Sequence, residues 1–388
     1  MVTTTLKEII TQSLHIGKTN TILFIASLVQ AIIQAECIKP YRLARAIPGF
    51  RSEKLDAKVK RIRELIGGEK LQDFVAYSSY ILKILGHDKV TLAMDRTNWQ
   101  HGDTYINFLI LSAVWDDGVS IPLYWIHIDN KGGNSDSETR IKLIEWFTDN
   151  FGEDKIKIIL ADREFPAEEF YDWLKLKGIN SLFRSRENVK ASDGNKRTLL
   201  SELYGQLKIG RQKIEKFIRR IYGHRMYVAV KRVNVRENGK KTTELVILVS
   251  PQEFSCDPFI QYRQRWSIEV MFNKFKGPGF NLEDTSVTDA KRLSGLLMLL
   301  SLAYFFSCYA GKIRRKIIAI KKKTGKNVKN RSERFVWNAY SLFRYGLDLI
   351  KHVLFVQKDM ILHDKLWKLL NGGRLRIGSP LIPLIKSI

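Results

Sequence analysis

Residues 89–95 have the sequence KVTLAMD, and residues 155–162 have the sequence KIKIILAD. In the first segment apolar residues alternate with smaller or polar ones, a period of two that is typical of a β-strand. The second segment is a short continuous apolar run, as in a strand buried on both faces. Each predicted strand ends at an aspartate, Asp95 or Asp162. Because α/β sheets present reactive groups at the carboxyl ends of their strands, the pair predicts an α/β fold with an acidic edge.

The residues around these two segments complete an alternating pattern of strands and helices. The predicted order is strand, strand, strand, helix, strand, helix, strand, which argues for a mixed sheet with flanking helices. The remaining predicted elements are strands at 105–115 and 119–128, separated by a turn at 116–118, a helix at 137–150, a helix from 166 to about 177, and a strand at 179–184.

The rest of the chain divides by pattern into further segments. Residues 1–85 have apolar residues at helical spacing, and we expect a small helical domain that binds DNA. We expect 86–184 and 251–310 to be two parts of one α/β core. Between them, 185–250 predict a β-rich basic insertion with strands at 226–233 and 243–249. Residues 311–388 are basic and then helical, a possible region of DNA contact and dimerisation.

The net charge favours a polyanionic partner. The chain has 388 residues, with 65 Lys and Arg against 40 Asp and Glu, a formal charge of +25. Residues 184–250 contain 17 basic and 6 acidic side chains, and 311–334 contain 11 and one. Such concentration favours nucleic acid over a membrane surface. A soluble protein that is simply basic remains an alternative.

Two features bear on the cellular compartment. The three cysteines lie far apart in the sequence, which suits a reducing cytoplasm and not a disulfide framework. The apolar stretch 294–310 is at the short limit for a membrane-spanning helix and contains Ser and Tyr. We therefore expect a buried core helix there, a cytoplasmic protein and no membrane partner.

A third acidic element follows the β-rich segment. Residues 257–276 have a helical period, and on one helix Tyr262, Arg265, Glu269 and Lys276 share an arc of about 60°. A solvated i,i+4 ion pair explains Arg265 and Glu269. It does not explain why a tyrosine and a second cation lie in the same line.

These residue types suit phosphodiester chemistry. Mg²⁺ prefers oxygen ligands, including protein carboxylates. Two such ions about 4 Å apart can activate an attacking oxygen and stabilise the leaving one. Asp95, Asp162 and Glu269 can hold both ions, while the cations and Tyr262 contact phosphates.

The spacing Tyr262-x2-Arg265-x3-Glu269-x6-Lys276 resembles the Tyr-Arg-Glu-Lys (YREK) signature of bacterial DDE transposases of insertion-sequence family four. Asp95 and Asp162 lie where the two aspartates of that family are expected, and the resemblance covers about 89–285. It implies an RNase H-like catalytic core interrupted by a β-rich insertion. It also implies that Asp95, Asp162 and Glu269 are the catalytic metal ligands. The implied DNA contacts are Tyr262, Arg265, Trp266 and Lys276.

The resemblance further implies two Mg²⁺ ions per site, with Mn²⁺ as a substitute, and cut-and-paste movement. The partners would be terminal inverted repeats, target DNA and a second copy of the chain in a homodimer, in the bacterial cytoplasm at the nucleoid. Relatives that form DNA hairpins stack a flipped base on an aromatic residue of the insertion, often tryptophan. Residues 185–250 contain no tryptophan. The candidates Tyr204, Phe217, Tyr222 and Tyr227 stay open.

Three other functions compete with transposition. An RNase H-like nuclease such as a resolvase cuts without joining, and it has no need of a reader of transposon ends in 1–85. A non-catalytic transposase remnant binds DNA, but all three acids are present here. A carboxylate-pair hydrolase without a nucleic-acid role is disfavoured by the charge of +25.

Overall fold

The computed structural model describes residues 4–48, 53–115, 118–129, 135–194, 196–237, 240–277, 279–318, 322–326, 334–338, 341–356, 359–374 and 379–387. The chain forms two compact units, one of residues 86–272 and one of residues 1–85 with 273–388. The first boundary lies where the sequence pattern changes from helix to strand. The expected boundary at 310–311 lies within one continuous helix, α11 (Ala290–Ile317).

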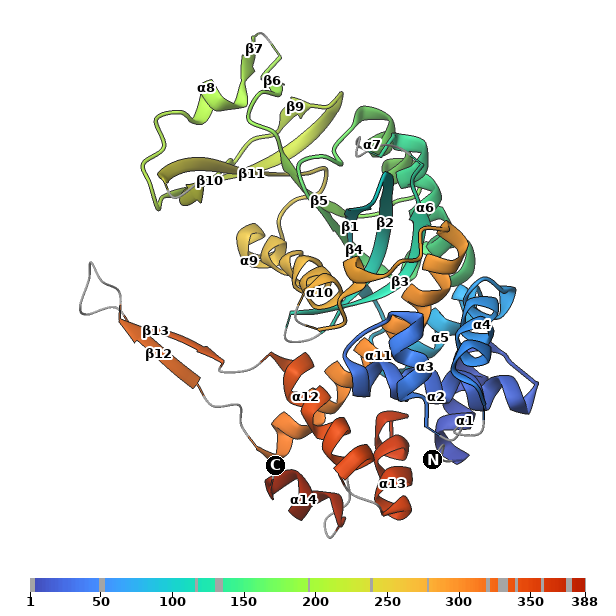
Figure 1. Cartoon of the computed structure of the whole chain (residues 1–388). Helices are drawn as coiled ribbons and strands as arrows, with labels where there is room; N and C mark the ends of the chain where they lie inside the picture. Colours follow the sequence, from blue (N-terminus) through green and yellow to red (C-terminus); the bar gives the residue numbers. More distant parts are fainter. Residues whose placement is uncertain are drawn as a thin grey trace. The chain divides into compact units, whose positions relative to one another are not determined.

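The unit of residues 86–272 is built on one mixed sheet (Figure 1). The strand order is β3-β2-β1-β4-β5-β11-β10-β9-β6-β7, with β8 paired to β10. β4 runs parallel to both β1 and β5. The elements are β1 (Val90–His101), β2 (Thr104–Trp115), β3 (Val119–His127), α6 (Ser137–Phe151), η2 (Glu153–Lys155), β4 (Ile156–Ala161), α7 (Glu168–Leu176), β5 (Ser181–Ser185), β6 (Lys190–Ser192), β7 (Arg197–Leu199), α8 (Leu200–Tyr204), β8 (Gln212–Ile214), β9 (Arg219–Ile221), β10 (His224–Glu237), β11 (Lys240–Ser250), α9 (Pro258–Arg263) and α10 (Trp266–Lys276), whose last residues belong to the other unit.

The predicted order of strands and helices from β1 to β5 is confirmed. One prediction is wrong: the first strand does not end at Asp95 but continues to His101. It continues because the antiparallel ladder with β2 extends from Thr91 to His101. The parallel pairing with β4, in contrast, stops at Met94. Asp95 therefore lies in the middle of a strand, one residue beyond its last pairing with β4.

The strands expected at 226–233 and 243–249 are present within β10 and β11, which are both longer. β11 pairs with β5 through Leu248 and Arg184, so these strands extend the sheet that carries Asp95. Turns were expected at 116–118 and 238–240. Residues 116, 117, 238 and 239 lie outside the described residues.

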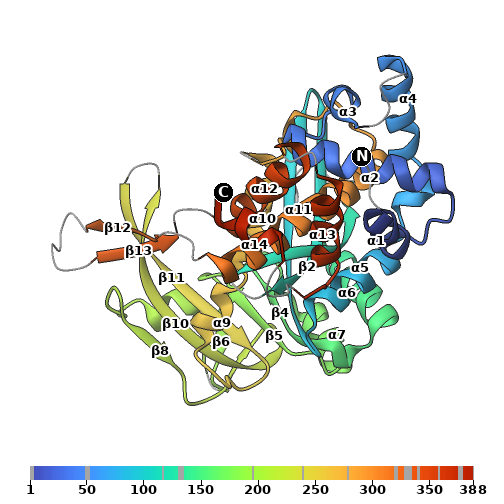
Figure 2. The ribbon, with the colours of Figure 1, turned by 90° about the horizontal axis from the view of Figure 1, so that it is seen from below.

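Helices cover the sheet through the alternation of side chains along each strand. On one face a core of Ile158, Leu160, Leu182, Ala229 and Leu248 packs against Phe259 and Tyr262 of α9. On the other face Phe183 of β5 stacks on Phe170 of α7, with ring centroids 5.8 Å apart. Figure 2 shows α9 and α7 on different sides of β5. Successive side chains of a strand point to opposite faces. Since Leu160 faces α9, Asp162, two residues later, lies on the same face.

The single helix expected at 257–276 is instead two helices, α9 and α10, separated by Gln264 and Arg265. The N–H of Arg265 donates to the carbonyl of Tyr262 at 2.9 Å, and the N–H of Ile268 donates to that of Arg265 at 3.0 Å. These i to i+3 bonds wind the chain more tightly than an α-helix does. The angles expected for one helix therefore do not hold between Tyr262 and Glu269.

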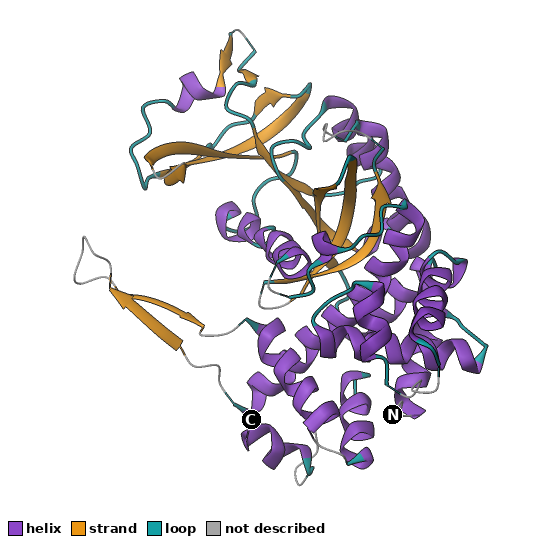
Figure 3. Ribbon diagram, viewed as in Figure 1, coloured by secondary structure: helices purple, strands orange, loops and turns teal. Residues whose placement is uncertain are grey.

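The unit of residues 1–85 and 273–388 is mainly helical, as Figure 3 shows. The helical pattern expected in 1–85 is confirmed. The elements are α1 (Thr4–Leu14), α2 (Thr19–Ala35), α3 (Pro40–Ala46), α4 (Leu55–Ile66), η1 (Glu69–Leu71), α5 (Phe74–Leu85), η3 (Leu282–Asp284), α11, β12 (Lys322–Lys326), β13 (Arg334–Asn338), α12 (Leu342–Lys351), a π-helical turn at His352–Val356, α13 (Met360–Leu370) and α14 (Leu381–Ser387).

Helix α11 contains the apolar stretch 294–310 and forms the core of this unit. By length and composition it could cross a membrane, as could the bent pair α1 and α2 if counted as one span. However, 94% of the apolar window of α11 is buried, which confirms the prediction of a core helix. It packs closely on α12, where Gly311 and Gly346 bring the two backbones together.

Candidate active site

The register of three neighbouring strands places two aspartates and an arginine in one row. Met94 of β1 pairs with Ala161 of β4, and Ala161 pairs with Phe183 of β5. The next residues along the chain are Asp95, Asp162 and Arg184. Since neighbouring strands lie about 4.8 Å apart, the three backbone positions are adjacent at this edge.

Asp95 is a largely buried carboxyl with ionisable neighbours. Its side chain is 17% exposed, and its Oδ1 accepts a hydrogen bond from the N–H of Arg96 at 2.8 Å. Burial raises the pKa of Asp95 to about 7, and the nearby charges of Asp162 and Glu269 act in the same direction. The guanidinium of Arg265 and the Arg96 N–H lower the pKa but do not outweigh burial. The carboxyl therefore titrates near neutral pH.

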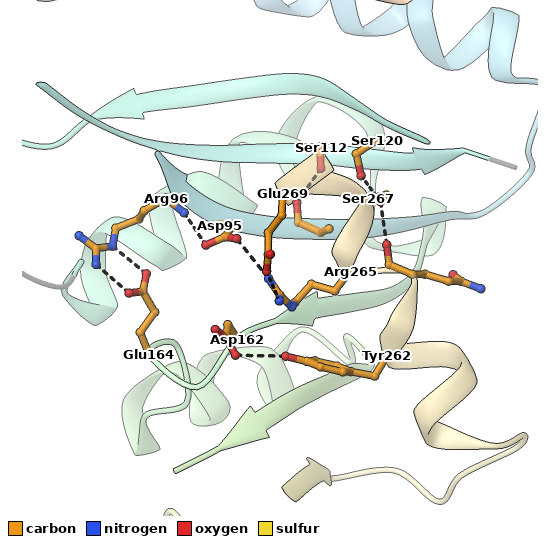
Figure 4. A network of polar contacts seen from close by, with 12 residues as sticks. Asp95, Arg96, Ser112, Ser120, Asp162, Glu164, Tyr262, Arg265, Ser267 and Glu269 are labelled. Carbon is orange, nitrogen blue, oxygen red and sulfur yellow. Dashed lines mark hydrogen bonds and ion pairs between the residues drawn. The ribbon is translucent and has the colours of Figure 1, made fainter. Parts of the chain in front are cut away.

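Arg265 lies between two of the three acids (Figure 4). One Nη atom is 3.1 Å from Oδ2 of Asp95, and the other forms an ion pair with Oε1 of Glu269. The residue is only 6% exposed. Burial acts against its charge, but its neighbours, Asp162 among them, raise its pKa above the ordinary value for arginine. The guanidinium is thus a fixed positive charge inside a group of carboxylates.

Tyr262 completes the convergence on the second aspartate. Its hydroxyl donates to Oδ1 of Asp162 at 3.2 Å, and Cζ of Arg265 lies 5.5 Å from its ring centroid. Burial raises the pKa of Tyr262, so the phenol stays protonated. The tight turn between α9 and α10 therefore delivers Tyr262, Arg265 and Glu269 to Asp95 and Asp162, although the three do not lie on one regular helix.

Two side-chain contacts, one partly buried and one buried, hold the elements that carry these residues. Arg96 donates from Nε and Nη2 to the two carboxylate oxygens of Glu164, each at 2.7 Å. This fork joins the strand of Asp95 to the loop that begins at Asp162. Ser267 of α10 shares a hydrogen bond of 2.5 Å with Ser120 of β3. The start of the helix that bears Glu269 is thereby fixed to the sheet (Figure 4).

The donor chemistry of Asp95, Asp162 and Glu269 fits a hard divalent cation, since all three offer carboxylate oxygens. Among the described residues, however, no three His, Cys, Asp or Glu side chains are assembled closely enough to hold a metal ion as they stand. Arg265 pairs with Asp95 and Glu269 in this arrangement. In this arrangement the guanidinium supplies the positive charge that faces these two carboxylates.

The other two predicted contacts lie at the ends of α10. Trp266 is its first residue and is 58% exposed. Lys276 is its last residue and forms an ion pair with Glu283 at 3.2 Å, inside the mainly helical unit.

Sequence reasoning missed Arg184, although a signal was present. The predicted strand 179–184 ends at this arginine, just as the neighbouring predicted strands end at aspartates. Arg184 also lies close enough to affect Tyr262. Burial raises the pKa of Tyr262, and the positive charge of Arg184 lowers it by a smaller amount.

The four aromatic candidates for base stacking differ in exposure. Phe217 is 51% exposed, and Cζ of Arg219 lies 4.8 Å from its ring centroid. Tyr204 is buried, with its hydroxyl donating to Glu215 at 2.9 Å. Tyr222 and Tyr227 are partly buried. Phe217 is therefore the candidate that offers most of its ring to a ligand.

The chain is an α/β protein whose mixed sheet brings carboxylates and arginines together across neighbouring strands. With a charge of +25, this arrangement is typical of proteins that bind phosphate groups. The model of the transposase DDE domain family matches residues 86–306, more than half of the chain, and the chain belongs to this family. A search of curated proteins gives no match. The family identifies a transposase, with DNA as its partner, from a group of enzymes that generally use divalent metal ions.

Proposed function

We propose that this transposase cuts and joins DNA at the ends of an insertion sequence by a cut-and-paste mechanism. The observation that carries the proposal is the row of Asp95 and Asp162 on adjacent parallel strands, joined through Arg265 and Tyr262 to the segment that bears Glu269. Asp95, Asp162 and Glu269 are the proposed ligands of two Mg²⁺ ions, for which Mn²⁺ substitutes.

The strand order supports an RNase H-like core. β3, β2 and β1 are antiparallel neighbours, and β4 and β5 follow in parallel. In this interpretation 185–250 is the β-rich insertion, because it lies between the strand preceding Asp162 and the helix with Glu269. The spacing of Tyr262, Arg265, Glu269 and Lys276 supports assignment to insertion-sequence family four.

The chain's own residues have distinct proposed tasks. Bound divalent ions would supply Lewis acidity for phosphodiester cleavage. Arg265, released from the carboxylates, pairs with a phosphate of the scissile strand, since a guanidinium matches carboxylate and phosphate alike. Tyr262, which stays protonated, donates a hydrogen bond to a phosphate oxygen. Trp266 and Lys276 contact DNA from the two ends of α10.

We also propose the partners that such movement requires. They are terminal inverted repeats, target DNA and a second copy of the chain in a homodimer. Residues 1–85 would contact the repeats, and 311–388 would contribute DNA contact and dimerisation. The proposed location is the bacterial cytoplasm, at the nucleoid.

Cleavage of DNA that contains the gene with its flanking sequences tests the proposal. Asp95→Asn, Asp162→Asn and Glu269→Gln should each abolish Mg²⁺-dependent nicking and leave DNA affinity nearly unchanged. Asp103→Asn, an exposed aspartate between β1 and β2, is the matched control and should cleave normally. Full cleavage by any of the first three variants removes that residue from the site.

The products separate the remaining alternatives. Joining of the freed ends to a target plasmid supports transposition, whereas cutting without joining identifies a nuclease. Binding without any cleavage by the wild-type chain in Mg²⁺ or Mn²⁺ identifies a non-catalytic remnant.

A further inference from the structure

A second group of charged residues lies beside the carboxylates. A cavity of about 650 Å³ is lined by Asp162 and by three arginines, Arg163, Arg184 and Arg186. The cavity is therefore continuous with the row of Asp95, Asp162 and Arg184. Its size and its guanidinium groups suit a phosphate-bearing ligand.

A single carboxylate holds two of these arginines. Oε1 of Glu244 on β11 accepts from Nη1 of Arg163 at 2.9 Å and forms a second ion pair with Nη2 of Arg184. Arg184 is held by the sheet and its side chain is 16% exposed, whereas the side chain of Arg163 is 56% exposed. Two guanidinium groups that converge on one oxygen of an anion are arranged as they would be around a phosphate.

The acids that line the cavity are Asp162, Glu164 and Glu187, and none of them is the partner that holds Arg163 and Arg184. Glu164 is engaged by Arg96 in the two-point ion pair described above. Glu187 accepts a hydrogen bond from the N–H of Leu245 at 2.8 Å. Asp162 belongs to the proposed metal ligands. Glu244 is thus the carboxylate that neutralises Arg163 and Arg184.

We propose that Arg163 and Arg184 form a binding site for a DNA phosphate next to the scissile one, and that Glu244 fills this site until DNA displaces it. The site rests on the proposed function, because Arg184 continues the row of metal-binding carboxylates. A DNA phosphate bound at Arg184 would therefore lie next to the phosphate bound at Asp95 and Asp162 on the same DNA strand. The negative charge of Glu244 repels DNA from this site. It therefore weakens the binding of DNA that does not also contact the other proposed DNA-binding residues.

The test measures binding of a fluorescently labelled single-stranded oligonucleotide to the full chain in EDTA, by anisotropy over a range of salt concentrations. Glu244→Gln keeps the side-chain shape but removes the charge, and should bind about three- to tenfold more tightly than wild type. Glu138→Gln is the matched control, because Glu138 is 74% exposed on α6 and pairs only with Lys142 among the contacts described. It should change affinity less than about twofold.

Arg184→Ala in the Glu244→Gln background identifies the site of the gain. The double variant should lose the added affinity, and the slope of log affinity against log salt should fall by about 0.7 for the lost contact with a single-strand phosphate. Melting temperatures of all variants check that each is folded.

The outcomes are distinguishable. Equal effects of Glu244→Gln and Glu138→Gln, or a gain that survives Arg184→Ala, overturn the phosphate site. The phosphate site is also overturned if substitution of Arg163 or Arg184 leaves the affinity of the wild-type chain for DNA unchanged. If the wild-type chain binds neither this oligonucleotide nor double-stranded DNA that carries the terminal repeats, the proposed function itself is wrong.

Discussion

Replacing Arg265 by methionine should destabilise the unit of residues 86–272 when divalent ions are absent. Methionine replaces the aliphatic stem of the arginine with an apolar chain of similar length. It removes the guanidinium between Asp95 and Glu269. Arg265 is 6% exposed, and the two acids are 17% and 29% exposed. Loss of one partner of a buried ion pair costs about 3–5 kcal/mol. Because the acids keep some contact with water, we expect about 3 kcal/mol.

The measurement is calorimetric unfolding at pH 8 in EDTA, above the pKa of Asp95 in the wild-type chain. A loss of about 3 kcal/mol corresponds to a fall in Tm of roughly 6–12 °C for a unit of this size. Arg263→Met is the control, because Arg263 is exposed at the end of α9. It should change stability by less than about 0.5 kcal/mol.

Two further measurements connect this loss to the carboxylates. Asp95→Asn should restore part of the stability of Arg265→Met, with a coupling of about 1–3 kcal/mol, because it removes an unpaired charge. Mg²⁺ should raise the Tm of Arg265→Met more than that of wild type, since the ions no longer compete with the guanidinium. A loss below about 1 kcal/mol together with zero coupling would refute the interpretation of Arg265 as the counter-ion of the site.

Three other predictions concern acidity, packing and DNA contact. The raised pKa of Asp95, about 7 in the folded chain against 3.8 unfolded, means that only the folded chain keeps this proton between pH 4 and 7. The free energy of unfolding should therefore fall as pH rises through that window, by at most about 1.4 kcal/mol per unit, and urea titrations of Asp95→Asn should lack this slope. Gly346→Ala places a Cβ too close to the carbonyl oxygen of Ser307 and should cost about 2–3 kcal/mol. Gly17→Ala, with open space around it, should cost far less, and equal losses would contradict tight packing. Trp266→Ala should weaken DNA binding about tenfold in anisotropy at unchanged Tm, and unchanged affinity removes it from the DNA contacts.

The strands and helices from β1 to β5 were predictable because their signals are local. Apolar alternation before Asp95 and the buried run before Asp162 depend on which side chains face the core, and that pattern is written in consecutive residues. The end of β1 was not predictable, because its extension to His101 depends on pairing with β2, a partner in space. The break between α9 and α10 was missed for a similar reason: its i to i+3 bonds interrupt a run whose helical period continues on both sides.

The sequence alone determined that Asp95, Asp162 and Glu269 are the acids to consider, because strand ends and the spacing to Tyr262, Arg265 and Lys276 are properties of the chain order. Only the tertiary structure placed Arg184 in the same row and Glu244 against it. Strand register and the meeting of β5 with β11 join residues far apart in the sequence. The i,i+4 pair of Arg265 with Glu269 is a property of the sequence, but only the fold could reveal that Arg265 also pairs with Asp95, because Asp95 lies on another element.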